Sequence, residues 1–453
     1  MSTLMTGIAG IRGVIGDGLS PDVIARYGAA FGTFMKGGKI VVGGDTRPSR
    51  EMVRSALFSG LISVGCDIID IGLATTPTIE LMVVQHQAAG GICVTASHNP
   101  VSWNAMKFLD HRGRFLGLED GGEVNRLFEE REFDYVGVHH LGKLRKHEEG
   151  GVEAHIKAVL ENEFIDVTAI RRAQFRVALD CVNSVGNLIV PNLLHDLGCD
   201  IRKVHGDISG EFGREAEPTP ENLTDLSDLV ANEGMDIGFA LDPDGDRLAI
   251  VNEHGQPIGE ELTLALAIKH VLSLEKGPVV MNLSSSRASE DVARAAGVEV
   301  YRTPVGEAHV ATEMDRVNSI IGGEGNGGVM LPGVHANRDA MVGIGLILSM
   351  LATQNQPLSV LVSRLPQYTL IKRKTPVGTL TFESIQDSLR QVFTDAQNID
   401  TRDGMRIDLE ESWIHVRPSN TEPIVRIFAE AKSKPAAQEL AERATMAIKG
   451  EQA

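Results

Sequence analysis

Apolar and polar positions along the chain follow two periods, one typical of helices and one typical of short buried strands. Ser20-Pro21 opens a helical stretch that ends near Lys36, because serine is a good N-cap and proline suits the first helical position. Two glycines follow, and residues 39–43 then predict a buried strand, because residues 40–42 are β-branched and apolar. This alternation of helix and buried strand is typical of α/β proteins.

One pattern of strand, polar loop, helix, glycine and strand occurs three times. Its copies start with the apolar runs at residues 40–45, 175–180 and 278–282. Each copy is a βαβ unit, which requires parallel strands. The intervals are too long and uneven for a solenoid, so we predict three homologous mixed α/β domains. After Pro366, strands rich in Lys and Arg and two helices predict a smaller α+β domain at the C-terminus.

Changes in composition set the predicted domain boundaries. A charged stretch at residues 143–151 ends in Glu-Glu-Gly-Gly, and a turn cluster occupies residues 252–257. The predicted domains are 1–148, 149–254, 255–366 and 367–453.

Composition narrows the class of protein. The chain has 453 residues, of which 42% are hydrophobic and 23% charged, as expected of a globular protein with several cores. Its formal net charge of −18 disfavours nucleic acid as a partner, and an anionic substrate must be held by local positive groups or a metal. The N-terminus does not resemble a signal peptide, and the most apolar run, residues 342–351, is too short to cross a bilayer. We therefore expect a cytoplasmic protein without membrane contact.

The cysteines are scattered without the spacing of metal ligands. Each lies in or beside an apolar run, at Cys66, Cys93, Cys181 and Cys199. This predicts buried, reduced thiols and no disulfide framework.

A serine on a tight loop is the first candidate for chemistry. An apolar run ends a buried strand at Val94, and Asn99-Pro100 forces a turn, because proline fixes its own φ and restricts the residue before it. Ser97 therefore lies just beyond the carboxyl end of a strand, where open α/β sheets collect catalytic groups. A serine hydroxyl needs a base, a metal or an electric field to become a nucleophile. A lone loop serine more often satisfies its own turn.

Three aspartates at alternate positions are the second candidate. Asp242, Asp244 and Asp246 lie in a turn between two strand-like runs, and carboxylates this close repel one another unless a cation lies between them. Oxygen ligands of this kind select Mg²⁺ or Ca²⁺. An EF-hand is excluded, because Arg247 stands where that loop needs glycine and the flanking runs are strands. The alternative is a solvated acidic turn without a metal.

Two further stretches carry groups suited to phosphate and sugar. After a strand that ends at Val416, a loop presents arginine, hydroxyl and amide donors, and the next strand carries Arg426. These donors suit a phosphate cradle, although a hairpin with incidental arginines fits as well. The glycine-rich residues 322–328 predict a flexible loop that brings Glu324 and Asn326 close to a ligand. A carboxylate and an amide suit sugar hydroxyls.

Four motifs, in this order, resemble those of the α-D-phosphohexomutases. They are Thr95-Ala96-Ser97-His98-Asn99-Pro100, Asp242-Pro243-Asp244-Gly245-Asp246-Arg247, Gly323-Glu324-Gly325-Asn326-Gly327-Gly328 and Arg417-Pro418-Ser419-Asn420-Thr421-Glu422-Pro423. The resemblance extends from Ile11-Arg12-Gly13 to Arg426, and the last two motifs look like those of archaeal-type phosphoglucosamine mutases. It implies three α/β domains and a C-terminal domain of another fold around a central cleft.

The resemblance also implies a mechanism. Ser97 carries a phosphoryl group in the resting enzyme, and Mg²⁺ is bound by that group and the three aspartates. A hexose monophosphate is phosphorylated to a 1,6-bisphosphate, the activator of the enzyme, which turns over and returns its other phosphate to Ser97. By position, the residues implied to line the reacting phosphate are Arg12, His98, Lys107 and Arg247. The sugar is contacted by Glu324 and Asn326, and the other phosphate is held by Arg417, Ser419, Asn420, Thr421 and Arg426.

One departure from the family concerns the proton acceptor. Gly328 ends the glycine-rich motif, where many members carry a histidine. We hypothesise that His335 replaces it from a polar loop expected over residues 332–339, oriented by Asp339 or Arg338. In the alternative, His335 only caps the helix that starts near residue 340 or faces solvent, and Lys107 or His98 is the base.

The resemblance predicts an isomerase of carbohydrate metabolism, an intramolecular phosphotransferase that interconverts glucosamine 6-phosphate and glucosamine 1-phosphate. A phosphomannomutase/phosphoglucomutase is the alternative, with the same chemistry on a neutral hexose. A non-catalytic phosphosugar-binding protein has no use for a phosphorylatable Ser97 beside a metal site. We expect a phosphosugar substrate and a monomer or homodimer.

Overall fold

The computed structural model describes residues 3–146, 151–378, 380–418 and 424–449. Its internal packing divides the chain into two compact units. One unit is formed by Met1–Thr263 and Asn326–Leu361, and the other by Leu264–Gly325 and Val362–Ala453. Each unit has its own buried apolar core.

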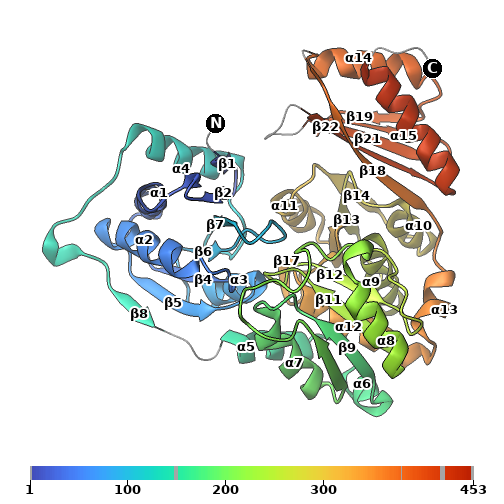
Figure 1. Ribbon diagram of the computed structural model, residues 1–453, viewed down its shortest axis with the longest axis horizontal. Helices are drawn as coiled ribbons and strands as arrows, with labels where there is room; N and C mark the ends of the chain where they lie inside the picture. Colours follow the sequence, from blue (N-terminus) through green and yellow to red (C-terminus); the bar gives the residue numbers. More distant parts are fainter. Residues whose placement is uncertain (1–2, 147–150, 379, 419–423, 450–453) are drawn as a thin grey trace. The chain divides into compact units, whose positions relative to one another are not determined.

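The first unit begins with a mixed sheet built on the predicted buried strands (Figure 1). The strand order is β1-β2-β7-β6-β4-β5-β8, with β3 beside β2. Strand β4 is parallel to β5 and β6, whereas β7 is antiparallel to β6. The bounds are β1 (Met5–Gly7), β2 (Gly10–Ile15), β3 (Gly18–Leu19), β4 (Ile40–Gly44), β5 (Ile68–Leu73), β6 (Gly90–Val94), β7 (Trp103–Leu109) and β8 (Leu144–Lys146).

Helices cover both faces of this sheet. Successive residues of a strand face opposite sides, so Ile40 and Val42 join a core with α1, α2 and α4, whereas Val41 joins a core with α3. The helices are α1 (Pro21–Phe34), α2 (Arg50–Ser63), α3 (Thr76–Gln85) and α4 (Leu118–Glu130), with the short 3₁₀ helix η1 (Val138–His140). The predicted first helix and the strand after it are confirmed to within a few residues.

A second sheet in the first unit repeats this plan. Its order is β10-β9-β11-β12, in which β9 is parallel to β10 and β11, and β12 is antiparallel to β11. The strands are β9 (Arg176–Asp180), β10 (Asp200–Val204), β11 (Ile237–Leu241) and β12 (Leu248–Val251), and the helices are α5 (Gly151–Leu160), α6 (Val167–Ala173), α7 (Gly186–Asp196), η2 (Pro220–Asn222) and α8 (Thr224–Glu233). The three aspartates therefore lie in the turn between β11 and β12, as predicted.

The rest of the first unit is a hairpin followed by a buried helix. Strands β16 (Gly328–Leu331) and β17 (His335–Arg338) pair antiparallel, with an irregular register at Met330/Leu331. Helix α12 (Ala340–Gln354) follows and is buried from Ala340 to Leu351, as expected of a helix that is apolar on all sides. Helices α9 (Glu260–Leu274) and α13 (Leu358–Ser363) contain residues of both units.

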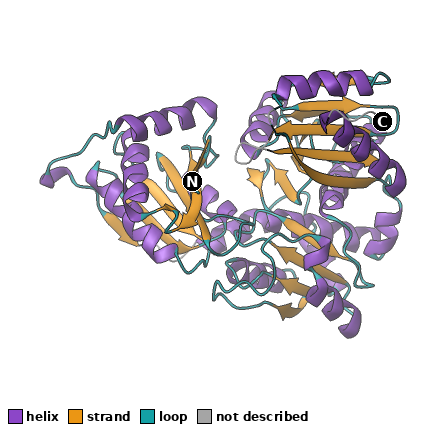
Figure 2. Ribbon diagram, turned by 45° about the horizontal axis from the view of Figure 1, so that its top comes forward, coloured by secondary structure: helices purple, strands orange, loops and turns teal. Residues whose placement is uncertain are grey.

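The second unit contains the third βαβ copy and the C-terminal sheet. Strand β13 (Val279–Asn282) is parallel to β14 (Val300–Thr303) and β15 (Ile321–Glu324), and the helices of this part are α10 (Arg287–Ala295) and α11 (Glu307–Val317). The C-terminal sheet is antiparallel, and α14 and α15 pack on it (Figure 2). Its order is β18-β22-β21-β20-β19. The bounds are β18 (Thr369–Pro376), α14 (Phe382–Val392), β19 (Asn398–Asp400), β20 (Met405–Asp408), β21 (Trp413–Pro418), β22 (Ile424–Ala431) and α15 (Lys434–Lys449).

The predicted fold class is confirmed, since all three βαβ copies form parallel pairs and the C-terminal part is α+β. Three local predictions were wrong. Residues 322–328 are not a loop throughout, because β15 extends to Glu324 and β16 starts at Gly328. Residues 332–339 are not only a loop either, since they contain β17. The strand expected to end at Val416 runs on to Pro418, so Arg417 lies on β21 and not in the loop after it. In each case, pairing with a neighbouring strand satisfies backbone groups that a loop leaves to water.

No helix in the described ranges has both the length and the apolar composition that crossing a bilayer requires. The four cysteines are free thiols, as predicted. Cys66, Cys93 and Cys181 are buried, whereas Cys199 is only half-buried.

Candidate active site

Ser97 lies on a strained turn directly after β6. Its backbone has φ 49°, in the left-handed region that residues with a side chain rarely adopt. The Ser97 N–H donates to Thr95 Oγ1 over 2.9 Å, and Thr95 Oγ1 in turn donates to Asp45 Oδ2 over 2.6 Å. Backbone strain of this kind persists where surrounding contacts enforce it, and it concentrates at functional sites.

Arg47, at the end of β4, enforces the shape of this turn. The side chain is fully buried, and its guanidinium donates to the carbonyls of Ser97, Asn99 and Pro100, the last over 2.6 Å. The same group forms an ion pair with Asp45, with 3.0 Å between Nε and Oδ2. Several carbonyls of one loop therefore share one buried cation, which fixes the backbone of the Ser97 loop. No motif in the sequence pointed to this role of Arg47.

The aspartate turn is buried and fixed by its own backbone. Asp242, Asp244 and Asp246 have no exposed side-chain surface. Asp242 Oδ1 accepts from the backbone N–H groups of Asp246 and Arg247, each over 3.2 Å. Gly245 has φ 72°, and a Cβ there would lie 2.9 Å from Thr75 Cγ2, so the turn requires glycine at this position.

The structure brings Ser97 and the aspartate turn together, although 145 positions separate Ser97 from Asp242 in the sequence. The Ser97 hydroxyl donates to Asp242 Oδ2 over 2.7 Å, and His98 Nδ1 lies 3.4 Å from the same hydroxyl oxygen. Thr76, at the start of α3, donates through its hydroxyl to Asp244 Oδ2 over 2.8 Å. A buried serine hydroxyl therefore lies against a cluster of carboxylates.

Three cationic side chains surround these carboxylates. Lys107 Nζ, from β7, lies 2.7 Å from Asp244 Oδ2 and 3.9 Å from Asp246 Oδ2. Arg338 Nη2, from the end of β17, lies 2.6 Å from Asp246 Oδ2. Arg247 Nε lies 3.8 Å from Asp246 Oδ1. Arg12 is on β2, where Ala105 of β7 is its register partner.

The carboxylates fit a bound cation. Asp244 Oδ1 and Asp246 Oδ1 are buried and accept no hydrogen bond. Burial, together with the charges of Asp246 and Asp244, raises the pKa of Asp242 well above its usual range. Unpaired, buried carboxylate oxygens that repel one another are the donor set that a hard divalent cation satisfies. The ligand atoms of the three residues lie within 4.8 Å of one another.

The same surroundings set the charge of the neighbouring bases. Burial lowers the pKa of Lys107, but Asp244 and Asp246 outweigh it and raise that pKa above its ordinary value. Burial and the charge of Arg247 lower the pKa of His98 to about 2. In this arrangement Lys107 is charged and His98 is neutral.

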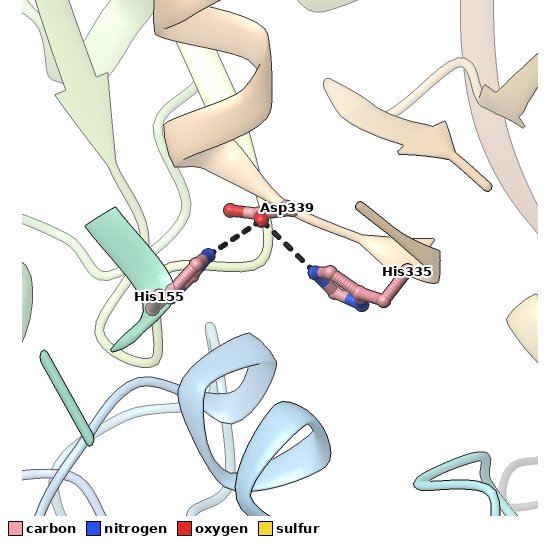
Figure 3. A group of neighbouring side chains, drawn as sticks. All are labelled: His155, His335 and Asp339. Atoms are coloured by element: carbon pink, nitrogen blue, oxygen red, sulfur yellow. Dashed lines mark hydrogen bonds and ion pairs between the residues drawn. The ribbon is translucent and has the colours of Figure 1, made fainter. Parts of the chain in front are cut away.

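A second cluster joins His155, Asp339 and His335 (Figure 3). Asp339 Oδ2 lies 2.7 Å from His155 Nε2 and 2.9 Å from His335 Nε2, while its Oδ1 accepts from Met341 N at the start of α12. His335 Nδ1 lies 3.8 Å from Glu80 Oε2 of α3. The sequence offered Asp339 or Arg338 as the residue that orients His335, and of the two it is Asp339 that bonds the ring. The N-cap of α12 is Asp339 itself, so the suggestion that His335 caps this helix was wrong.

Spacing alone makes this cluster a possible metal site. Both imidazoles already bond the same carboxylate oxygen, and His155 Nδ1 lies 2.9 Å from Thr78 Oγ1. A chain of hydrogen bonds therefore accounts for the cluster without a metal. His155 was missed from the sequence, because its partner Asp339 lies 184 positions away.

In the second unit, Glu324 is buried at the end of β15. Its Oε1 accepts from Asn282 Nδ2 over 2.7 Å and from Gly306 N, at the N-cap of α11, over 3.0 Å. In the first unit, Asn326 Oδ1 accepts from Gly328 N over 3.2 Å. The structure thus fixes both side chains that the sequence assigned to sugar binding.

Basic residues form one row across the C-terminal sheet. In the register, Arg426 of β22 pairs with Arg417 of β21 on one side and with Lys374 of β18 on the other. Residues directly opposite in neighbouring strands share a face. Arg417 Nε lies 2.9 Å from Asp403 Oδ2. The other predicted phosphate ligands, Ser419, Asn420 and Thr421, lie outside the described residues.

Comparison with known proteins identifies the family. The chain matches, in order, the four domains of the phosphoglucomutase/phosphomannomutase family: alpha/beta/alpha domain I over residues 3–135, domain II over 153–255, domain III over 260–368 and the C-terminal domain over 370–446. A probable phosphoglucosamine mutase of Methanopyrus kandleri is 35% identical over 441 residues, which are 96% of this chain and 95% of the relative. The chain belongs to this family, the α-D-phosphohexomutases.

Other relatives agree. A phosphoglucomutase/phosphomannomutase of Thermococcus kodakarensis is 37% identical over 443 residues, covering 96% of each chain. The crystal structure of a phosphoglucomutase/phosphomannomutase family protein from Burkholderia thailandensis superimposes with a TM-score of 0.85 at 26% identity and covers 98% of each chain. The chain is therefore an intramolecular phosphotransferase, a phosphohexomutase, and belongs to a metal-dependent family.

Proposed function

We propose that this phosphohexomutase interconverts glucosamine 6-phosphate and glucosamine 1-phosphate through a phosphorylated Ser97. One observation carries the choice of nucleophile: the Ser97 hydroxyl is buried and lies 2.7 Å from Asp242 Oδ2, in a cluster of three buried aspartates. The name of the M. kandleri relative supports glucosamine phosphates as substrates.

We assign the metal to Mg²⁺, which would be held by Asp242, Asp244, Asp246 and the phosphoryl group on Ser97. An all-oxygen donor set of carboxylates and a phosphoryl oxygen suits this hard cation. When bound, such an ion neutralises negative charge on the transferring phosphoryl group. The unpaired oxygens of Asp244 and Asp246 support this assignment.

The chain's own residues account for the transfer. The bond between Ser97 Oγ and phosphorus breaks, a bond from phosphorus to a sugar hydroxyl oxygen forms, and the hydroxyl proton passes to a base. The product is a hexose 1,6-bisphosphate, which after turning over returns its other phosphoryl group to Ser97. We assign the oxygens of the reacting phosphate to Lys107, Arg247, His98 and Arg12. The positions of Lys107 and Arg247 beside the aspartates support this assignment, because a cation there can compensate phosphate charge.

We assign the remaining roles by domain. Domain 1–148 supplies the phosphoserine loop, domain 149–254 the metal loop, and domain 255–366 the sugar ligands Glu324 and Asn326. Domain 367–453 holds the phosphate that is not reacting, through Arg417, Ser419, Asn420, Thr421 and Arg426. The row of Arg417, Arg426 and Lys374 across the C-terminal sheet supports this last role, since three cations on one face attract a phosphate dianion.

We retain His335 as the candidate proton acceptor, with Lys107 and His98 as the alternatives. Asp339 orients the ring of His335 through Nε2, as a carboxylate does for a general base. Its Nδ1 faces Glu80, so proton transfer requires that ring nitrogen to leave this neighbour. Replacing His335 by Ala is expected to lower turnover by roughly a hundredfold or more while Ser97 phosphorylation persists. Near-normal turnover would leave Lys107 or His98 as the base.

A coupled assay tests the substrate. Glucosamine, glucose and mannose 6-phosphates are compared with the purified protein, Mg²⁺ and glucose 1,6-bisphosphate as activator. The highest kcat/KM is expected for glucosamine 6-phosphate. A higher value for glucose or mannose phosphate would make the chain a phosphoglucomutase/phosphomannomutase, as the T. kodakarensis relative is named. Turnover of none of the three would contradict the proposed function.

A further inference from the structure

The side chain of Arg338 occupies the space beside Gly328. A Cβ built on Gly328 would lie 2.2 Å from Arg338 Cδ and 2.7 Å from Arg338 Cγ. These atoms belong to the middle of the arginine stem and cannot move aside unless the whole side chain moves. Glycine at position 328 and arginine at position 338 are therefore a matched pair. The space that a side chain at position 328 would fill is therefore taken by the arginine.

Arg338 reaches the aspartate turn from this position. Its Nη2 lies 2.6 Å from Asp246 Oδ2, the same carboxylate oxygen that lies 3.9 Å from Lys107 Nζ. Only 11% of the Arg338 side chain is exposed, so the guanidinium is largely withdrawn from water. A charge in such surroundings acts more strongly on a nearby anion than an exposed one does.

The backbone around Arg338 is held on both sides. Arg338 is the register partner of Met330 in the β16–β17 hairpin. The next residue, Asp339, is fully buried, bonds both His155 and His335, and caps α12 (Figure 3). An arginine anchored in this way loses little freedom on binding a ligand, which favours binding of a phosphoryl group in a defined geometry.

We propose that Arg338 is a catalytic residue that binds the phosphoryl group in transit between Ser97 and the sugar, from the place that a histidine at position 328 would take. This proposal rests on the proposed function. Arg338 supplies a permanent charge and planar N–H donors to the phosphoryl oxygens. It neither accepts nor gives up a proton, because a guanidinium stays charged. As Ser97 Oγ–P breaks and the new P–O bond forms, the sugar hydroxyl's proton must therefore go to a different group.

Variants of Arg338 separate its charge from its volume. Arg338→Met removes the charge and keeps much of the stem, and kcat is expected to fall by roughly a hundredfold or more, with a smaller change in KM. Arg338→Lys is expected to lose less, since it keeps the charge. Free guanidinium added to Arg338→Ala is expected to restore part of the lost activity. Arg316→Ala, which removes an exposed arginine paired with Glu313 on α11, is the matched control.

A binding measurement gives a readout that does not depend on turnover. In the Ser97→Ala background, which cannot form the phosphoenzyme, Arg338→Met is expected to weaken binding of glucose 1,6-bisphosphate measured by calorimetry. The control Arg316→Ala is expected to leave it unchanged. Equal affinity with and without Arg338, or a kcat for Arg338→Met within about threefold of the parent enzyme, would overturn the proposal.

An exchange variant tests the matched pair. In Gly328→His the new side chain collides with the arginine stem, so activity is expected to fall, and Gly328→His/Arg338→Ala is expected to recover part of it. The double variant is also expected to gain an ionisation near the ordinary histidine pKa of about 6.5 in its pH–kcat profile. A double variant no more active than Gly328→His alone would contradict the shared position.

If the parent enzyme turns over no hexose phosphate, the proposed function fails rather than the role of Arg338, and the binding measurement still tests that role.

Discussion

Ser97 and its neighbours show how burial changes the chemistry of single side chains. A loop serine in water is unreactive, but this one is held at φ 49° with its hydroxyl on Asp242. The carboxylates beside it are crowded and partly unpaired, which makes them receptive to a cation. The sequence predicted Ser97 and the three aspartates as individual residues, because each occurs in a distinctive local motif. Their contacts with Arg47, Thr76 and Arg338 depend on strands far apart in the chain, so no local pattern could predict them.

The first prediction concerns the covalent state of Ser97. Intact-mass measurement of the purified protein is expected to show a fraction heavier by one phosphate, and peptide mapping is expected to place it on Ser97. Ser97→Ala is expected to lack this species, because it lacks the hydroxyl that donates to Asp242 and that would carry the phosphoryl group. Phosphate found only on other residues would rule out Ser97 as the carrier.

The second prediction concerns Asp244, whose Oδ1 is buried without a hydrogen bond. Asp244→Asn removes one negative ligand from the cation site, and metal affinity is expected to fall at least roughly tenfold. Activity is expected to fall with it and to recover only in part with excess Mg²⁺. Titration of the metal-free protein with Mg²⁺ by calorimetry measures the affinity directly. If chelation leaves the parent enzyme fully active, the metal has no catalytic role.

At the scale of elements, the cluster around Asp339 joins parts that are distant in the sequence. His155 is on α5, His335 is on β17, and Asp339 is the N-cap of α12, while Thr78 of α3 bonds His155. Of these helices the sequence predicted only α12, from the apolar run after residue 340. Sequence patterns failed at residues 322–328 and 332–339, where glycines and polar residues suggest a loop and strand pairing outweighs that preference.

The third prediction tests the stability that this cluster provides. Asp339→Asn leaves two buried imidazoles without their anionic partner and weakens the cap of α12. Breaking a buried charged network in this way is expected to lower the free energy of unfolding by about 3–5 kcal/mol. Urea unfolding followed by circular dichroism measures it. Asp22→Asn, which changes an exposed aspartate on α1, is the control and is expected to have little effect. Equal stability of the two variants would show that the cluster contributes nothing.

At the scale of the whole molecule, charge is distributed unevenly. The chain carries a formal net charge of −18, yet Lys107, Arg338 and Arg247 gather at the aspartate turn, and Arg417, Arg426 and Lys374 form a row on the C-terminal sheet. The sequence predicted that local cations or a metal must hold an anionic substrate. It also predicted the order of α/β and α+β parts from their repeating pattern. It did not predict the division into two compact units, because that depends on packing between segments that are remote in the chain.

The fourth prediction concerns pH and the second unit. Burial, with a smaller contribution from Arg417, lowers the pKa of His415 to about 4. The unfolded chain has a histidine pKa near 6.5, so below that pH the unfolded state binds a proton that the folded state excludes. Stability is therefore expected to fall as the pH decreases from about 6.5 to about 4. Thermal unfolding across this range measures the effect, and His415→Asn is expected to reduce the slope. An unchanged slope in this variant would assign the pH dependence to other groups.

The close fit of Gly328 and Arg338 also restricts how such a site can evolve. A β-carbon at position 328 would lie 2.2 Å from the arginine stem, so a side chain gained there while Arg338 keeps this conformation is expected to be harmful. A lineage that gains such a side chain is expected to shorten residue 338 first, and it then passes through an ancestor with neither side chain in place. Substitutions at the two positions should therefore be coupled: where residue 328 carries a side chain, residue 338 is expected to be smaller than arginine.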